Sequence, residues 1–314
     1  MKLRGIDFGK VLGASGVQGF FGEGYQYQDF LKAVGLLKMD GITFVAKTAT
    51  LNYNKGNMPL RKDLRPQKWL PSCIWVNIFQ GTALNAVGLS NPGADALLQD
   101  GRWQRRSKPF MISFMAIGKT REERLQEAKL FVKLLKAYLS ELKGRIAIQI
   151  NFSCPNTGHD PKELIAEIKP TLDIFAELDV PLLVKVNPLV SDEEIMDIAL
   201  HPACDGFCLF NTIPFGEGDD VDWARLFPDG SPLIGFGSGG GLSGTLLTSL
   251  TLKRIEGLYG VGMRKAMIAH SMMSREDVLT AWRSGASAVA IGTVVPTRFW
   301  RVRSMVKAAN EAFD

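Results

Sequence analysis

Short apolar segments alternate along this chain with longer segments whose apolar residues recur at helical spacing. Residues 110–118, F-M-I-S-F-M-A-I-G, form a continuous apolar run that is typical of a buried strand. The following segment, residues 121–142, places Leu125, Val132 and Leu139 on one face of a helix. Strands that alternate with helices form parallel sheets covered by those helices, so the pattern predicts an α/β fold.

About eight buried strands are expected from residue 10 onward. They are residues 10–14, 41–47, 110–118, 145–150, 182–186, 205–210, 265–269 and 286–291. Helices are expected at residues 27–39, 121–142, 161–178, 246–259, 275–282 and 298–312. Ser191 and Glu194 form a capping box that predicts the start of another helix. Eight such units predict a (β/α)8 TIM barrel, with a doubly wound open sheet as the alternative.

We find no repeat, low-complexity tract or linker that would divide the chain. We therefore expect a single barrel domain over residues 1–314. Residues 52–91 interrupt the regular pattern, because they are rich in proline, asparagine and glycine and contain one strand-like run at residues 73–79. Long segments of this kind within a compact domain are usually functional, so we predict a lid or insertion that covers the C-terminal mouth of the barrel.

Composition excludes several classes of protein. A chain of 314 residues with 46% hydrophobic residues can bury a large core. The net charge of +5 is spread over segments of mixed sign, without the basic stripe of a nucleic-acid-binding protein. We therefore expect a small-molecule ligand and no nucleic-acid partner.

The cysteines and the N-terminus suggest where the protein resides. Cys73, Cys154, Cys204 and Cys208 form no even framework in so long a chain, and three histidines offer few metal ligands, so neither disulfides nor a metal site are expected. No segment approaches the roughly 18 apolar residues of a membrane helix, and the N-terminus lacks the apolar core of a signal peptide. We expect a cytoplasmic protein that has reduced thiols and no membrane contact.

The strongest candidate for chemistry is the segment at residues 146–156, I-A-I-Q-I-N-F-S-C-P-N. A short apolar strand leads directly into a polar segment that contains Asn151, Ser153, Cys154 and Asn156. The carboxyl end of a parallel strand is where α/β proteins bind ligands and carry out catalysis.

Other strand ends carry compatible groups. Lys47 and Lys185 each lie at the end of an otherwise apolar strand, and lysine is rarely drawn inward without an anionic partner. Glycine is concentrated at residues 235–244 and follows the last strand at Gly292. In a barrel, the loops after the last two strands commonly bind phosphate through backbone N–H groups, although tight turns alone would also explain these glycines.

The segment N-F-S-C-P-N-T at residues 151–157 closely resembles the catalytic loop of dihydroorotate dehydrogenases. The likeness is to the soluble class 1 enzymes, which have cysteine where class 2 members have serine. Further matches occur in the order of the family: A-S-G-V at 14–17, K-T-A-T-L at 47–51, N-M-P-L-R at 57–61, N-A-V-G-L-S-N at 85–91, L-V-K-V at 183–186, N-T at 211–212, G-G-L-S-G at 240–244 and I-G-T at 291–293. The resemblance therefore covers nearly the whole chain.

This resemblance implies an FMN-dependent oxidation of (S)-dihydroorotate to orotate, a step of pyrimidine and UMP biosynthesis. Cys154 would be the general base that removes the C5 proton, while hydride leaves C6 for the flavin N5. Lys47 would lie between substrate and flavin. The implied substrate-binding residues are Asn85, Gly88, Leu89, Asn151, Asn156, Asn211 and Thr212. Amide side chains suit a pyrimidine because each carries both donors and an acceptor.

The resemblance also implies the residues that hold FMN. Lys185 would lie near the flavin N1 and O2, where negative charge accumulates on reduction. The other implied cofactor contacts are Ala14, Ser15, Gly16, Lys47, Thr48, Asn151, Gly244, Ser271, Met272, Gly292 and Thr293.

One loop departs from the family pattern. After the seventh strand the family has a G-T-G-G-I type loop that binds the FMN phosphate, whereas residues 269–273 of this chain read A-H-S-M-M. If the loop keeps its path, Ser271 and Met272 can still donate backbone N–H groups, and His270 or Ser271 can add side-chain donors. Alternatively, the bulkier loop closes the pocket. His270 is then a core or surface residue.

The electron acceptor and the alternatives follow from the same resemblance. Class 1 relatives use either fumarate, usually as homodimers, or NAD with an iron-sulfur partner subunit. This chain has no C-x-x-C cluster, so an iron-sulfur centre would have to come from a partner subunit. We expect fumarate rather than NAD as the electron acceptor, and a homodimer. The alternatives are an FMN oxidoreductase of another pyrimidine or enone on the same scaffold, and a flavin-free binding or regulatory barrel.

Overall fold

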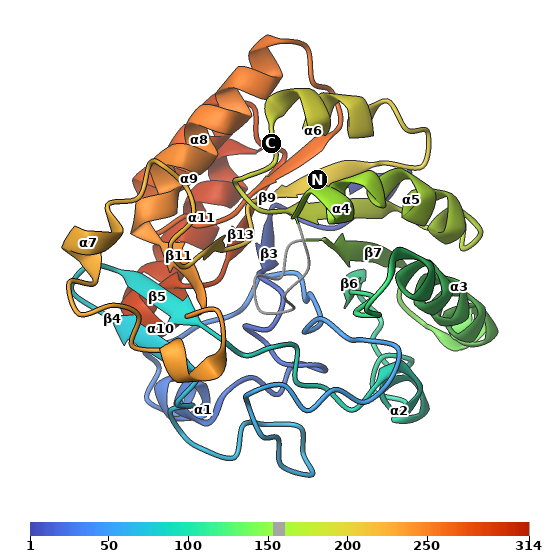
Figure 1. Ribbon diagram of the computed structural model, residues 1–314, viewed down its shortest axis with the longest axis horizontal. Coiled ribbons are helices and arrows are strands. Elements are labelled where there is room, and N and C mark those ends of the chain that lie inside the picture. Colours follow the sequence, from blue (N-terminus) through green and yellow to red (C-terminus); the bar gives the residue numbers. More distant parts are fainter. Residues whose placement is uncertain (153–160, 314) are drawn as a thin grey trace.

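The structure is a computed structural model that describes residues 1–152 and 161–313. Its centre is a parallel seven-stranded sheet in the order β3-β13-β12-β9-β8-β7-β6. The strands are β3 (Val11–Gly13), β6 (Phe110–Phe114), β7 (Ile146–Asn151), β8 (Leu182–Val186), β9 (Gly206–Leu209), β12 (Ala266–Ala269) and β13 (Ala288–Ile291). The expected (β/α)8 barrel is confirmed, and Figure 1 shows the helices placed around these strands.

The gap between the two edge strands is closed by residues 43–49. Thr43 pairs in parallel with Leu12 of β3, and Val45 and Ala49 pair with Met111 and Phe114 of β6. The strand expected at residues 41–47 therefore exists as a series of single bridges instead of a continuous ladder. These bridges complete the ring.

Helices alternate with the strands as the periodicity predicts. They are α1 (Gln26–Ala33), α2 (Ala94–Gln99), α3 (Arg121–Tyr138), α4 (Pro161–Ala166), α5 (Ile168–Ala176), α6 (Asp192–Ala199), α7 (Trp223–Leu226), α8 (Thr245–Gly260), α9 (Arg275–Arg283), α10 (Val294–Arg298) and α11 (Val302–Ala312), with short 3-10 turns η1 (Leu139–Glu141), η3 (Ile234–Phe236) and η4 (Phe299–Arg301). The capping box is confirmed, because the Ser191 hydroxyl accepts from the backbone N–H of Glu194 at the start of α6. The helices expected at 161–178 and 298–312 are each divided in two, at Glu167 and at η4.

The interior of the barrel follows the two-residue period of its strands. One apolar layer is formed by Leu12, Val45, Met111, Ala147, Leu183, Cys208, Ile268 and Ala288. The hairpin of β1 (Lys2–Leu3) and β2 (Ile6–Asp7) contributes Leu3 and covers this layer from the N-terminal side. Residues two positions further along the strands point into the same interior, nearer its C-terminal end. They include Ala14, Lys47, Lys185 and His270.

The segment expected to be a lid contributes to a second sheet. β4 (Ile74–Asn77) and β5 (Thr82–Asn85) form a hairpin that joins β11 (Gly241–Gly244) and β10 (Ile213–Pro214) in the antiparallel order β10-β11-β5-β4. Leu84 and Leu242 are buried in a small separate core beneath this sheet. The insertion is thereby tied to the loop after β9 and placed beside the barrel (Figure 1).

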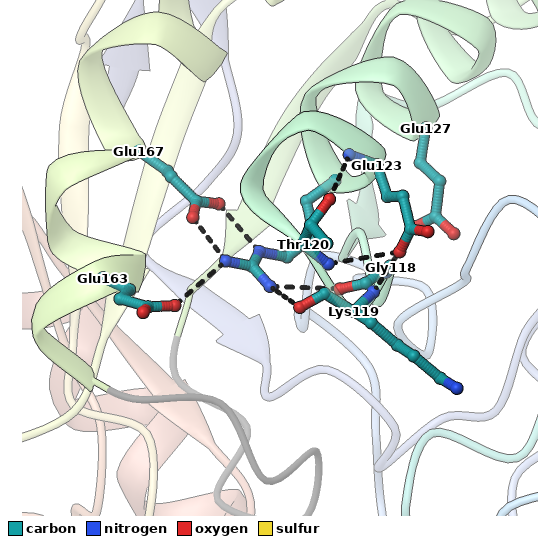
Figure 2. A network of polar contacts seen from close by, with 8 residues as sticks. Gly118, Lys119, Thr120, Glu123, Glu127, Glu163 and Glu167 are labelled. Atoms are coloured by element: carbon teal, nitrogen blue, oxygen red, sulfur yellow. Dashed lines mark hydrogen bonds and ion pairs between the residues drawn. The ribbon is translucent and has the colours of Figure 1, made fainter.

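A buried ion pair supports the loop after β6. Arg124 of α3 donates from Nε and Nη2 to the carboxylate of Glu167, at 2.9 and 2.5 Å, and from Nη1 to the carbonyls of Gly118 and Lys119 (Figure 2). Both charged side chains are 3% exposed. The pKa of Arg124 is raised, chiefly because of its hydrogen bond to Glu167. This pair connects α3, α5 and the β6–α3 loop.

Within the described residues, no helix is both long and apolar enough to cross a bilayer. The same residues hold no cluster of three side chains that could bind a metal ion.

Candidate active site at the barrel mouth

A cavity of about 280 Å³ opens where the parallel strands end. The residues inferred from the sequence that line it are Ala14, Ser15, Gly16, Lys47, Thr48, Asn85, Gly88, Leu89, Asn151, Lys185, Asn211, Thr212, Ser271, Gly292 and Thr293. They come from distant parts of the chain because the barrel brings successive strand ends to one face. Gly244 and Met272 are not in the lining.

The amide side chains lie close together. Asn151 at the end of β7 pairs in register with Lys185 of β8, and both are buried. The Nδ2 group of Asn211 donates to Oδ1 of Asn151 at 3.2 Å. Asn85 reaches the same cavity from β5. The cavity therefore presents several amide donors and acceptors beside a buried lysine.

Lys47 brings a second cation into the cavity. Its side chain follows Val45 by two residues and so points into the barrel interior. The Lys47 ammonium donates to the carbonyl of Ser90 and lies 4.9 Å from the centre of the Phe20 ring. These contacts fix the position of a charge that is 8% exposed.

The turn at Gly88 and Leu89 offers backbone donors. Both residues have positive φ, +65° and +57°. The Gly88 carbonyl accepts from Asn54 and the Leu89 carbonyl accepts from Asn91, at 2.8 and 2.7 Å. No acceptor among the described residues takes the N–H of Gly88 or Leu89, and both residues line the cavity. Such a turn can bind an anion.

The atypical loop after β12 presents backbone N–H groups at the cavity. Ser271 has φ +64°, a conformation that usually requires glycine, and its carbonyl accepts from the Thr248 hydroxyl at 2.7 Å. Across the described chain, nothing accepts from the N–H groups of Ser271, Gly292 and Thr293, and all three residues line the cavity. Met272 is directed into the hydrophobic core instead, where it is 1% exposed. The larger side chains have therefore not filled the site.

Hydroxyl groups form a chain along another wall of the cavity. The Ser15 hydroxyl donates to the carbonyl of Ala46 at 3.0 Å and lies 2.9 Å from the Thr48 hydroxyl. The Thr48 hydroxyl lies 2.9 Å from the hydroxyl of Ser113. The chain holds both cavity-lining hydroxyls in place.

His270 also lines the cavity, so it is neither a residue of the closed core nor a residue of the outer surface. Its side chain is 5% exposed. Burial, followed by the nearby charge of Lys185, lowers the pKa of His270 well below 6.5. The imidazole is therefore neutral at physiological pH.

Ser153, Cys154 and Asn156 lie outside the described residues, so the roles inferred for them stay predictions. The three described cysteines, Cys73, Cys204 and Cys208, are buried free thiols outside the cavity lining. Burial raises their pKa values to about 11, 12 and 12. None of these three is suited to act as a base at neutral pH.

Several other lining residues were not implied as site residues by the sequence. They are mostly apolar or aromatic and come from the segments around the barrel mouth: Tyr25, Tyr27, Leu70, Pro71, Ile74, Val76, Ala83, Phe210, Ala290 and Pro296. Val17, Val87 and Ser243 also line the cavity, and they lie within the motifs at 14–17, 85–91 and 240–244. Arg61, the last residue of the N-M-P-L-R motif, pairs with Asp63 on the surface.

Comparisons with known proteins agree with this geometry. A family model described as dihydroorotate dehydrogenase matches residues 1–308. The catalytic subunit of dihydroorotate dehydrogenase B (NAD(+)) from Desulforudis audaxviator (strain MP104C) is 29% identical over 293 residues, which are 90% of this chain and 81% of the relative. A putative dihydroorotate dehydrogenase A (fumarate) from Aquifex aeolicus (strain VF5) is 30% identical over 225 residues, which are 67% of this chain and 66% of the relative.

Solved structures support the fold. The crystal structure of DHODH from Eimeria tenella in complex with ferulenol superposes with a TM-score of 0.66 and 19% sequence identity. The superposition covers 99% of this chain and 82% of the other. A similar barrel is thus formed by a distant sequence.

Proposed function

This chain belongs to the dihydroorotate dehydrogenase family, and on that premise we propose that its barrel-mouth cavity oxidises (S)-dihydroorotate to orotate with FMN as cofactor. The protein is accordingly a flavin oxidoreductase of pyrimidine biosynthesis. The observation that carries the proposal is that two buried lysines, three amide side chains and several backbone N–H groups with no acceptor among residues 1–152 and 161–313 meet in one cavity. Few ligands need all of these groups. FMN and dihydroorotate together do, because one carries a phosphate and the other carries a carboxylate on a pyrimidine ring.

The cavity fits FMN at its phosphate and along its ring. The N–H groups of Ser271, Gly292 and Thr293 would hold the phosphate. Ser15, Thr48 and Lys185 would contact the ring system. When bound, FMN supplies the acceptor for the hydride that leaves C6 of the substrate. Lys185 stabilises negative charge that develops beside it, because its ammonium is buried and already in place.

Dihydroorotate would lie against the amide side chains. Asn85, Asn151 and Asn211 would orient the imide groups of its ring, and the Asn211–Asn151 hydrogen bond pre-positions two of the three. The substrate carboxylate would be held by the N–H groups of Gly88 and Leu89 and by the Lys47 ammonium. A fixed cation and rigid turn bind a carboxylate at low entropic cost.

The base proposed for the C5 proton is Cys154, three residues after Asn151. Its thiolate would take the proton at Sγ. Thr212 and Asn156 are the remaining proposed substrate contacts, and Gly16 is a further proposed FMN contact. The insertion at residues 52–91 would act as the cover that excludes water from the cavity, since Gly88 and Leu89 line it from that segment.

Purified protein is expected to bind FMN and to show the absorption spectrum of a bound flavin. Anaerobic addition of dihydroorotate should bleach this absorption and yield about one orotate per flavin. Reduction by another pyrimidine or an enone, but not by dihydroorotate, would move the proposal to that substrate. Colourless protein that takes up no added FMN would contradict it and leave a flavin-free binding barrel.

The second half-reaction is proposed to use fumarate, in a homodimer. Fumarate is a small dicarboxylate that can use the same cation and N–H groups as the substrate carboxylate, whereas NAD would need a further site. Relatives of both acceptor types are similar to this chain. Steady-state turnover by the purified chain alone should therefore be faster with fumarate than with NAD. Turnover with NAD that depends on an added iron-sulfur partner subunit would contradict this assignment.

A further inference from the structure

His270 is a polar side chain in the cavity wall that the proposed function does not use. It is 5% exposed and lines the cavity. Its Nε2 atom is buried with no hydrogen-bond partner, and its Nδ1 atom has none among the described residues either. An unpaired buried imidazole nitrogen costs roughly 1–3 kcal/mol, so a ligand that pairs it would gain from doing so.

The backbone holds this imidazole firmly in its place. The N–H of His270 donates to the Leu209 carbonyl at 2.6 Å, which extends the β12–β9 ladder by one residue. The side chain consequently continues the interior row of Ile268 and points into the barrel. Thr248 fixes the following residue, Ser271, through its carbonyl.

His270 lies near a cation and beside backbone N–H donors of the cavity. Burial, and then the nearby charge of Lys185, lowers the pKa of His270 and keeps the ring neutral. Ser271, its neighbour in the chain, belongs to the N–H groups proposed to bind phosphate. A neutral imidazole carries one donor and one acceptor, which matches a hydroxyl group, since a hydroxyl also donates and accepts. Neither a phosphate nor an apolar ring would satisfy both nitrogens.

FMN has hydroxyl groups between its ring and its phosphate, in the ribityl chain. We propose that His270 binds a ribityl hydroxyl of FMN through its imidazole nitrogens. This inference rests on the proposed function, and it adds a cofactor contact to those proposed above. His270 is thus a binding residue for the flavin side chain.

The test compares three flavins on the full-length protein freed of flavin. Riboflavin has the ribityl chain without phosphate, and lumiflavin has neither. Binding is measured from the quenching of flavin fluorescence. His270→Leu should weaken FMN and riboflavin binding by about tenfold, the factor that corresponds to about 1.4 kcal/mol, and leave lumiflavin binding unchanged. His270→Asn, which keeps a donor and an acceptor, should recover most of the affinity.

Met272→Leu serves as the matched control, because Met272 is in the same loop but directed into the core. It should bind all three flavins like the wild-type protein. Equal weakening of all three flavins by His270→Leu, or unchanged FMN binding, would overturn the inference. Wild-type protein that binds no flavin would overturn the proposed function together with it.

A measurement on the wild-type protein covers the case in which the His270 variants fail to fold. The chain has three histidines, so their ring nitrogens give few NMR signals. With 15N-labelled histidine, riboflavin should shift the ring signals of His270, whereas lumiflavin should not. Identical shifts with both flavins, or none with riboflavin, would overturn the inference.

Discussion

Replacement of Cys154 by alanine is expected to slow the reduction of bound flavin by dihydroorotate by about 10²–10⁴-fold, the range for loss of a general base. Sγ of Cys154 is the proposed acceptor for the C5 proton, and alanine has no group that can take it. FMN binding should be unchanged because the proposed phosphate and ring contacts come from other loops. Anaerobic stopped-flow absorbance with dihydroorotate measures the rate, and fluorescence titration measures the FMN affinity.

Cys204→Ala is the matched control for this prediction. Cys204 is buried in the outer core, and burial raises its pKa to about 12, so its thiol has no part in proton transfer. That variant should reduce its flavin at the wild-type rate. Cys154→Ser should retain part of the rate with a higher optimum pH, since serine occupies this position in class 2 relatives. Unchanged reduction in Cys154→Ala would remove Cys154 from the role of base.

Glu167→Gln is expected to lower the free energy of unfolding by about 3 kcal/mol, because removing one partner of a buried ion pair leaves the other charge poorly compensated. Arg124 and Glu167 are each 3% exposed and joined by two hydrogen bonds. Glu163 lies 3.5 Å from Arg124 but is 66% exposed, so solvent screens its charge and it compensates little. Urea denaturation of the two proteins, followed by circular dichroism, measures the difference.

Glu163→Gln is the control on the same arginine. Its expected effect is below about 1 kcal/mol, as for an exposed ion pair. Figure 2 shows both glutamates facing the β6–α3 loop from one side, with Glu123 and Glu127 accepting from backbone N–H groups of that loop on the other. Equal destabilisation by Glu163→Gln and Glu167→Gln would show that burial does not decide the strength of these pairs.

The alternation of strands and helices was readable because each element has its own periodicity. Continuous apolar runs predicted the buried strands β6 and β8, and the capping box predicted the start of α6. Other features were not local. Residues 43–49 complete the barrel through single bridges, and β5 pairs with β11, which follows it by more than a hundred residues. Pairing over such distances leaves no periodic trace in either segment.

Some residues of the candidate site could likewise be predicted from local sequence patterns, and others could not. Strand-end residues such as Lys47, Asn151 and Lys185 could be recognised because parallel strands bring their carboxyl ends together whatever the details of packing. The apolar wall from Tyr25, Leu70 and Val76 could not, since those residues resemble any others in an irregular segment.

The sequence by itself determined the barrel, its family and the chemical character of the strand ends, because these depend on short patterns along the chain. Only the tertiary structure decided the conformation and the side-chain directions of the atypical loop after β12. Ser271 adopts a left-handed conformation with its N–H at the cavity, and Met272 packs into the core. His270 faces inward, and no group in the described part of the chain pairs with its ring nitrogens. The direction of each side chain in this loop depends on the hydrogen bond to Leu209 of β9 and on the hydrogen bond from Thr248 of α8. Both partners are distant from the loop in the sequence.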